Sequence, residues 1–374
     1  MPNTLKAIDT LIHARWIIPI EPHDTVLEDH AIAVHEGRIV ELLPSNEAND
    51  KYSAEAVHQL TDHALIPGLV NAHTHAAMSL FRGLADDLPL MDWLQHHIWP
   101  AESRWINAEF VADGSRLAIA EMLRGGTTCF NDMYFFPDET ARVADHAGIR
   151  AVVGLIVIDI PTVWAANADE YLHKGIEVHD QFRHHPLITT AFAPHAPYTV
   201  SDEPLQRIVT FAEELDIPIH MHLHETAHEV QEAEANSGQR PLARLEQLEL
   251  VSPRFMAVHM TQLADEEIEH FAISGAHVVH CPESNMKLAS GFCPLQQLLD
   301  AGVNVALGTD GAASNNDLDM FSEMRSAALL GKVVARNASA ISAAQALHIA
   351  TLGGAKALGL DAQIGSLEIG KAAD

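Results

Sequence analysis

Two histidines separated by a single residue, His73 and His75, are the first group in this sequence that could do chemistry. In a β-strand, residues i and i+2 project to the same face, so both imidazoles can reach one metal ion. A second run repeats this spacing with His220, His222 and His224. The sequence does not choose among these three, although we expect His220 to be packed deep in the strand and His224 to lie in the loop that follows. Together the two runs predict a metal site with imidazole ligands.

An aspartate between glycines, in Gly308-Thr309-Asp310-Gly311, is a candidate oxygen ligand. The glycines permit a tight turn that would present the Asp310 carboxylate at the end of a strand, although an aspartate here could instead cap the next helix. The three cysteines (Cys129, Cys281 and Cys293) contain no C-x-x-C pair, so neither a disulfide framework nor a thiolate zinc site is indicated. Three imidazoles and one carboxylate suit zinc.

These residues need a scaffold that brings distant strand ends together. From Ala64 onward, short apolar runs alternate with helix-like segments, which is typical of parallel βαβ units. We expect eight strands, at Leu65–Asn71, Thr128–Asn131, Ala151–Ile158, Ile188–Ala193, Ile217–Leu223, Phe255–His259, His277–His280 and Val303–Gly308. Eight repeats favour an α/β fold with a closed (β/α)8 TIM barrel. An open doubly wound sheet is the alternative, but it usually carries a glycine-rich phosphate loop where this chain has Asn-Ala-His-Thr-His.

Polar residues gather at the predicted strand ends, where such barrels carry their catalytic groups. They are His73, His75, Asn131, Asp132, His195, His222, Glu225, His259, His280 and Asp310. The barrel would occupy residues 63–350. Residues 1–62 read as short strands and turns, and with the segment 351–374 they would form a small β-sandwich appendage built from the chain termini.

Composition excludes several classes of protein. The formal net charge of −29 repels nucleic acid and anionic lipid. No run approaches the roughly 20 apolar residues that span a bilayer, and the N-terminus lacks the pattern of a signal peptide. We therefore expect a cytoplasmic protein that binds neither nucleic acid nor membrane.

The motifs as an ordered set resemble those of the metal-dependent amidohydrolase superfamily. They are Pro67 through His75, His222-Leu223-His224-Glu225-Thr226, His259 and Gly308-Thr309-Asp310. More narrowly, the segments from His73 to Glu102 and from Ser284 to Leu288 resemble the 5′-methylthioadenosine/S-adenosylhomocysteine deaminases. The resemblance implies that His73, His75, His222 and Asp310 bind the metal, that Glu225 is the proton shuttle, and that His259 positions the attacking water. The carboxylated lysine that bridges two metals in other members has no counterpart here, since no lysine occurs between Lys174 and Lys287. We expect one zinc ion per subunit, with Fe²⁺ as an alternative.

The resemblance also implies a reaction, the hydrolytic deamination of an adenine ring at C6. Zinc would lower the pKa of its water to about 7, and Glu225 would deliver a proton to N1. Glu102 and His195 resemble the residues that contact the ribose of a small nucleoside. Trp93 and Met91 could form an apolar wall for the ring or the 5′ substituent, or could equally belong to the ordinary core.

One departure from the family bears on the substrate. Several members carry an arginine five residues after the one in a Gly-x-Arg segment, where this chain has Leu155 after Gly148-Ile149-Arg150. Without that clamp for the homocysteine carboxylate, we expect 5′-methylthioadenosine to be preferred over S-adenosylhomocysteine, with adenosine as a slower substrate. A second departure is the end of the chain, because the segment Ile364–Asp374 resembles only the start of the family's returning β segment. Either the chain is shortened or the appendage is incomplete.

Two other readings compete with this one. Another single-metal amidohydrolase acting on guanine, an oxidised purine or a triazine would use the same ligands. A scaffold that kept the barrel and lost the reaction is the second alternative. The presence of all four proposed ligands and Glu225 argues against the scaffold. We also expect a homo-oligomer.

Overall fold

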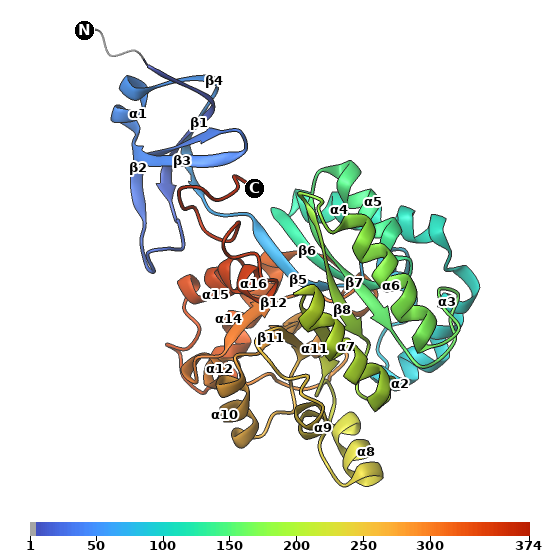
Figure 1. The fold of residues 1–374 in the computed structure, drawn as a ribbon. Helices are drawn as coiled ribbons and strands as arrows, with labels where there is room; N and C mark the ends of the chain where they lie inside the picture. The colour runs from blue at the N-terminus through green and yellow to red at the C-terminus, as the bar shows by residue number, and fades with distance from the viewer. Residues whose placement is uncertain (1–4) are drawn as a thin grey trace.

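The computed structural model describes residues 5–374, and its centre is a sheet of eight parallel strands. Along the sheet the order is β12-β11-β10-β9-β8-β7-β6-β5, the reverse of the chain order. The strands are β5 (Leu69–Thr74), β6 (Thr127–Tyr134), β7 (Arg150–Val157), β8 (Ile188–Pro194), β9 (Ile219–Leu223), β10 (Phe255–His259), β11 (His277–His280) and β12 (Asn304–Leu307). Sequential neighbours in a parallel sheet with helical crossovers curl toward closure. The predicted TIM barrel is confirmed (Figure 1).

The first and last strands meet directly after β12. The Asp310 amide donates to the His73 carbonyl at 3.0 Å, and the Thr309 amide donates to the Asn71 side chain at 3.0 Å. Gly308 permits this approach, since a Cβ there would lie 2.8 Å from the backbone of His73. The closure therefore places Asp310 beside the histidines of β5.

The largest difference from the predicted strands lies at the first of them. We predicted Leu65–Asn71, but Leu65 ends a strand of the appendage and β5 begins at Leu69. Pro67 has no amide hydrogen for the ladder. Gly68 passes so close to Thr128 that a Cβ would lie 1.9 Å from its hydroxyl oxygen. The strand consequently starts later and runs through His73.

Helices between the strands, and one after the last strand, cover the outside of the barrel. They are α4 (Ala108–Arg124), α5 (Pro137–Ala147), α6 (Ala168–Phe182), α7 (Asp202–Leu215), α10 (Asp265–Ser274), α12 (Leu295–Asp300) and α14 (Met320–Val334). Asparagine side chains cap two of them, with Asn107 accepting from the Phe110 amide at 2.9 Å and Asn167 from the Glu170 amide at 3.0 Å. These caps satisfy amides that the first helical turn leaves without partners.

The two ends of the barrel are covered by different segments of the chain. One end is closed by α16 (Leu352–Ala357) and the residues after it. Ala355, Leu358 and Ile364 pack there in one apolar cluster with Val70 of β5 and Ala306 of β12. At the other end lie short helices that follow the strands: α8 (Ala227–Ser237), α9 (Pro241–Gln247), α11 (Pro282–Lys287) and α13 (Ala312–Asn315). A longer excursion after β5 contains η1 (Ala76–Phe81), α2 (Leu90–Trp93), η2 (Leu94–Ile98) and α3 (Trp99–Trp105). The pocket that contains the predicted site residues lies at this second end.

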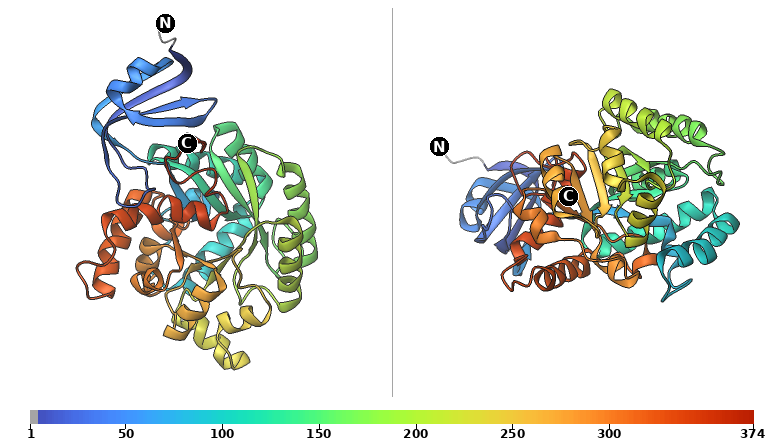
Figure 2. Two further views of the ribbon diagram at one scale, coloured as in Figure 1. Left: turned by 60° about the vertical axis from the view of Figure 1, so that its left-hand side comes forward. Right: turned by 90° about the horizontal axis from the view of Figure 1, so that it is seen from below.

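The predicted β appendage is a four-stranded sheet with the order β3-β2-β1-β4. Its strands are β1 (Lys6–Ile17), β2 (Leu27–His35), β3 (Arg38–Pro44) and β4 (Tyr52–Leu65), with α1 (Ser45–Lys51) between the last two. Figures 1 and 2 show this sheet beside the barrel, with the C-terminal segment between the two. That segment makes an isolated bridge between Ala372 and Arg38, and it adds no strand to the sheet within the described residues.

The helices that the structure describes include none long and apolar enough to cross a membrane.

Candidate active site

Three imidazoles and a carboxylate converge at the open end of the barrel, from the ends of three strands: β5, β9 and β12. The Nε2 atoms of His73 and His75 lie 3.4 and 3.3 Å from Oδ1 of Asp310. The Nε2 atoms of His73 and His222 are 3.3 Å apart. The structure therefore brings together all four residues predicted to bind the metal, although they span more than half of the chain.

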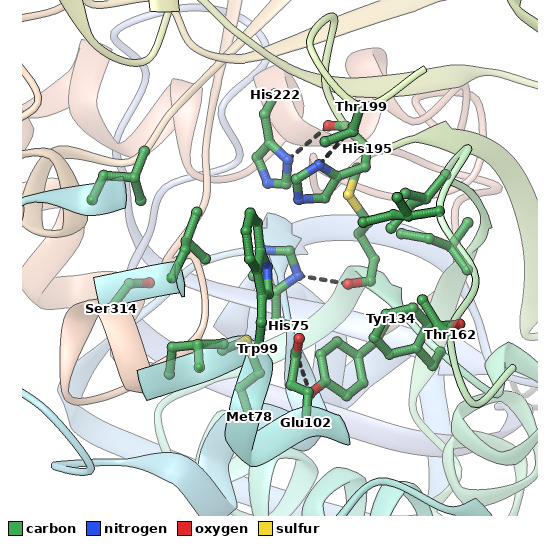
Figure 3. A pocket seen from close by; sticks show the side chains of 18 of the residues that line it. His75, Met78, Trp99, Glu102, Tyr134, Thr162, His195, Thr199, His222 and Ser314 are labelled. Atoms are coloured by element: carbon green, nitrogen blue, oxygen red, sulfur yellow. Dashed lines mark hydrogen bonds between the residues drawn. The ribbon is translucent and has the colours of Figure 1, made fainter. Parts of the chain in front are cut away.

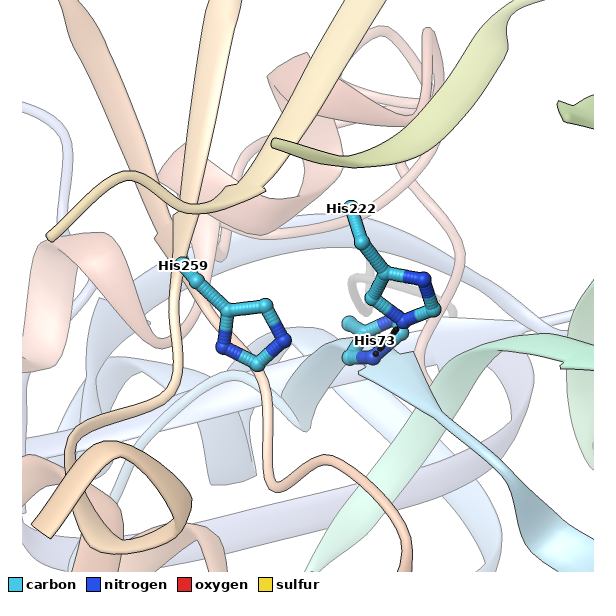
Figure 4. Close-up of side chains that lie close together, drawn as sticks. All are labelled: His73, His222 and His259. Atoms are coloured by element: carbon cyan, nitrogen blue, oxygen red, sulfur yellow. Dashed lines mark hydrogen bonds between the residues drawn. The ribbon is translucent and has the colours of Figure 1, made fainter. Parts of the chain in front are cut away.

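A fourth imidazole joins this cluster. His73, His222 and His259 offer nitrogens that all lie within 4.8 Å of one another (Figure 4). The ligand atoms of His73, His75 and Asp310 also lie within 4.8 Å of one another. His73 is common to both triads, and its ring is fully buried. The two triads therefore adjoin at His73, and each offers three atoms that could hold a metal ion.

The second ring nitrogens show that these histidines fit a metal. Nδ1 of His75 lies 2.5 Å from the Met133 carbonyl oxygen, and Nδ1 of His222 lies 2.8 Å from the His195 carbonyl oxygen. A carbonyl oxygen can only accept, so each Nδ1 carries the hydrogen and each neutral ring keeps its lone pair at Nε2. Both lone pairs then face the cluster, as metal ligation requires.

The three histidines of the β9 run have three different environments. His222 reaches the cluster, whereas Nε2 of His220 lies one layer behind, 2.9 Å from Nδ1 of His73. His224 follows the end of the strand with φ of 50°, and its ring accepts from the Leu242 amide at 3.2 Å. The left-handed turn removes His224 from the face shared by the other two.

Asp310 is oriented by its own surroundings. Its Oδ2 accepts from the hydroxyls of Ser284 at 2.6 Å and Ser314 at 2.8 Å, while Oδ1 accepts from the Gly311 amide at 2.7 Å. Oδ1 is also the oxygen that faces His73 and His75. The alternative role of a helix cap therefore does not account for the side chain's contacts.

Charge in the cluster favours a cation. Burial lowers the pKa of His73 to about 4 and that of His222 well below its ordinary value, so both rings are neutral. Burial alone would raise the pKa of Asp310, but its contacts with His73 and His75 outweigh burial and hold that pKa well below the ordinary value. Burial would lower the pKa of His75, and the contact with Asp310 instead raises it to about 9. His75 therefore holds a proton beside ionised Asp310, and a cation that binds here would displace that proton and leave neutral imidazoles around a carboxylate, a suitable metal-ligand set.

Glu225 lies beside His259 of the cluster, and both residues line the same pocket. Oε2 of Glu225 is 3.8 Å from Nε2 of His259. Burial raises the pKa of Glu225 above its ordinary value, so this carboxyl group can hold a proton more readily than an exposed glutamate. Nδ1 of His259 lies 2.8 Å from Oδ1 of Asn285, which leaves Nε2 directed to the pocket side.

The pocket opens from the cluster toward the excursion after β5. Glu102, His195 and Trp93 all line it, as predicted for substrate contacts, while half-buried Met91 is not among its described lining residues. The Tyr134 hydroxyl donates to Oε1 of Glu102 at 2.8 Å, and Nδ1 of His195 lies 3.0 Å from Oγ1 of Thr199 (Figure 3). Glu102 and His195 thus lie across from one another in a pocket that also has many apolar lining residues.

That apolar wall extends along the loop after β7. Ile156, Ile158, Ile160 and Val163 line it, and no lysine or arginine belongs to the described lining. Leu155, the residue from which we inferred a missing carboxylate clamp, is not part of the wall. Its side chain is buried against α6, where a Cβ on Gly175 would approach it to 3.2 Å. The expected lack of a clamp therefore follows from the whole wall and not from Leu155.

Comparison with known proteins agrees with this arrangement. The sequence profile described as the amidohydrolase family matches residues 64–374. The chain belongs to the amidohydrolase family. The resemblance inferred from the motifs is confirmed.

Individual amidohydrolases are similar to this chain over most of their length. A 5-methylthioadenosine/S-adenosylhomocysteine deaminase of Saccharophagus degradans is 52% identical over 374 residues, covering 100% of this chain and 84% of that protein. A protein of the same name from Thermodesulfovibrio yellowstonii is 43% identical, over 97% of this chain and 83% of its own.

Solved amidohydrolase structures share the fold. An adenosine deaminase from Xanthomonas campestris, crystallised with bound zinc, has a TM-score of 0.97 and 58% identity, covering 99% of this chain and 84% of its own. An atrazine chlorohydrolase from Arthrobacter aurescens, complexed with zinc, has a TM-score of 0.89 and 24% identity, covering 98% and 86% of the two chains. The second comparison supports the fold alone.

Several supporting residues of this amidohydrolase were not assigned a role from the sequence. Asp132 is buried and accepts from the Ala76 amide at 2.7 Å, next to His75. Asn131 contacts His220, and Ser284 and Asn285 hold Asp310 and His259. Their positions at strand ends, or in the Ser284–Leu288 motif, were visible, but only contacts reveal what each side chain holds. His280 is buried and lies outside the described pocket lining.

Proposed function

We propose that this amidohydrolase deaminates the adenine ring of 5′-methylthioadenosine, giving 5′-methylthioinosine and ammonia. One observation carries the proposal: a nitrogen-rich cation site and a buried glutamate share a pocket with two polar groups suited to a ribose. The relatives named as 5-methylthioadenosine/S-adenosylhomocysteine deaminases support the same choice.

The metal in this proposal is one zinc ion per subunit, held by His73, His75, His222 and Asp310, with Fe²⁺ as a substitute. The donor set of nitrogen and carboxylate oxygen fits either ion. When bound, such an ion supplies a water that is deprotonated near neutral pH, the nucleophile that this hydrolysis needs.

The protein's own residues would manage the protons. Glu225, whose pKa burial raises, would give a proton to N1 of the adenine ring. The resulting carboxylate would take the proton of the hydroxyl added at C6 and pass it to the amine, which leaves as ammonia while the C6 carbonyl forms. His259 and ionised Asp310 would accept hydrogen bonds from the attacking water and so orient it. All three residues line the pocket, and Oε2 of Glu225 lies 3.8 Å from Nε2 of His259, which supports these roles.

Glu102 and His195 would recognise the sugar. The Thr199 hydroxyl donates to the Ala196 carbonyl at 3.1 Å, so its oxygen accepts from Nδ1 of His195. His195 then presents a lone pair at Nε2, and ionised Glu102 can only accept. Both groups therefore call for hydroxyl donors, as the two hydroxyls of a ribose provide.

Substrate affinity should depend on pH through Glu102. Burial raises the pKa of Glu102 to about 7, against the opposing effect of the Tyr134 hydroxyl. Only the carboxylate accepts hydroxyl hydrogen bonds freely, so KM should rise as pH falls through 7, by up to about tenfold one unit below the pKa. Steady-state KM measured between about pH 6 and pH 8 tests this. Glu102→Gln should raise KM and remove its pH dependence, and a wild-type KM that stays flat would contradict the assignment.

The apolar wall should select against charged 5′ substituents. S-adenosylhomocysteine would place an ammonium and a carboxylate where no described lining residue is a lysine or arginine. We expect kcat/KM for 5′-methylthioadenosine to exceed that for S-adenosylhomocysteine by about 100-fold. 5′-Butylthioadenosine, similar in length but uncharged, serves as the control for size. Equal efficiency with S-adenosylhomocysteine would show that the wall does not discriminate by charge.

Ammonia release from 5′-methylthioadenosine, adenosine, S-adenosylhomocysteine and guanine, measured in parallel, tests the proposed function. We expect the first to be the best substrate and guanine to be inert, because guanine has no sugar for Glu102 and His195. Turnover of guanine alone would support the alternative, another single-metal amidohydrolase with the same ligands.

A further inference from the structure

A buried carboxylate next to the active site has no role in the chemistry described so far. Glu229, in the first turn of α8, is only 8% exposed. Its Oε2 accepts from the Glu225 amide at 2.8 Å, and its Oε1 accepts from the His224 amide at 3.0 Å. One side chain thus binds two consecutive backbone amides, and one of them belongs to the proposed proton shuttle.

The backbone conformation explains why these two amides need a partner. β9 ends at Leu223, and His224 has φ of 50°, in the left-handed region that residues with a Cβ rarely adopt. Such a turn takes the next amides out of the sheet ladder and lets consecutive N–H groups converge on one anion. A strained residue of this kind persists only where its surroundings hold it. Glu229 supplies the two acceptor oxygens.

Glu229 does not behave as an ordinary helix cap. Thr226 is the N-cap of α8, and its hydroxyl accepts from the Glu229 amide at 3.2 Å. In a capping box the glutamate would return a hydrogen bond to the N-cap amide. Gln345 does this at α15 (Ala343–Ile349), where it accepts from the Ser342 amide at 2.8 Å. Glu229 instead reaches past its cap to the two residues before it.

The other side of Glu225 is held as well. The Thr261 hydroxyl donates to the Glu225 carbonyl at 2.7 Å. With both its amide and its carbonyl fixed, Glu225 has a backbone that cannot shift without breaking a buried hydrogen bond. Its side chain then projects into the pocket, with Oε2 at 3.8 Å from Nε2 of His259.

We infer that Glu229 is a positioning residue, which holds the strained His224–Glu225 turn so that the Glu225 carboxyl group faces the substrate. The inference rests on the proposed role of Glu225. It predicts a lower kcat with little change in KM, because a small displacement of a proton donor reduces stabilisation of the transition state more than it reduces substrate binding.

Glu229→Ala and Glu229→Gln test the inference with the full chain in its metal-loaded form. We expect Glu229→Ala to lower kcat for 5′-methylthioadenosine by about 10- to 100-fold, with KM within about threefold of wild type and metal content unchanged. Glu229→Gln keeps one acceptor oxygen, so its kcat should fall between those of wild type and Glu229→Ala. The matched control is Gln345→Ala, which removes a helix-capping side chain far from the pocket and should lower thermal stability without lowering kcat.

An effect of Glu229→Ala no larger than that of Gln345→Ala would overturn the inference, since both would then act only as caps. A second readout does not depend on activity: amide hydrogen exchange at His224 and Glu225 should accelerate in Glu229→Ala and stay slow in Gln345→Ala. Unchanged exchange at these two amides would also refute the inference that Glu229 holds the turn. If wild-type protein deaminates no nucleoside, the proposed function fails, and the exchange experiment still decides whether Glu229 holds the turn.

Discussion

Glu225→Gln should reduce deamination of 5′-methylthioadenosine by about 10²- to 10⁴-fold while the protein keeps its metal. The substitution preserves the size of a side chain that lines the pocket and lies next to His259. An amide cannot pass a proton to N1 and take one back, so the loss should appear in kcat. Ammonia release measures it, and metal analysis of the same sample shows whether the cation site is intact.

The control for this experiment is Glu234→Gln, an identical chemical change at an exposed position of α8. We expect that variant to match wild type in kcat and KM. If Glu225→Gln retained near wild-type turnover, Glu225 would have no part in proton transfer, and the inference about Glu229 would lose its mechanistic basis.

Loss of the cation should be equally severe. His222→Ala removes an imidazole whose Nδ1 is anchored on the His195 carbonyl and whose Nε2 lies 3.3 Å from that of His73. We expect the variant to purify with little metal and with activity reduced by at least about 100-fold. Treating wild-type protein with a chelator should give the same loss, and added Zn²⁺ should restore the activity of wild type but not of His222→Ala.

Thermal denaturation gives a measurement of the metal site that is independent of activity. A ligand that binds only the folded state stabilises it, by about 2.7 kcal/mol when present at about 100 times its Kd. Zn²⁺ should therefore raise the Tm of metal-free wild type and leave that of His222→Ala nearly unchanged. His228→Ala, at an exposed histidine of α8, is the control and should behave like wild type. Full metal content in His222→Ala would remove this residue from the ligand set.

Much of the barrel could be predicted because its signals are local. Strands that are buried between helices are short apolar runs, and the predicted Phe255–His259 and His277–His280 have the bounds of β10 and β11. The position of chemistry was predictable too, since parallel strands of a barrel direct their carboxyl ends to one rim. That rule was enough to select His73, His75 and Asp310 as candidates for a single site.

Other features depend on contacts between residues far apart in the chain. His220, His222 and His224 have the same spacing and the same chemistry, so no local rule separates them. The left-handed turn at His224 and the 2.9 Å contact between His220 and His73 leave His222 as the one of the three whose Nε2 faces the cluster. Leu155 is an example of a position that the motif predicted wrongly. Its place in the motif suggested that it faces the pocket, but its side chain packs against α6 instead.

The sequence by itself determined the kind of protein: a barrel whose strand ends carry nitrogen and carboxylate ligands, with a glutamate close to one of them. It could do so because side-chain periodicity and strand-end position are properties of neighbouring residues. Only the tertiary structure decided which nitrogen of each ring faces the cluster, which wall meets the 5′ substituent, and that Glu229 holds the amide of Glu225. These depend on hydrogen-bond distances and packing across the barrel, and such distances are set by the closure of the whole sheet.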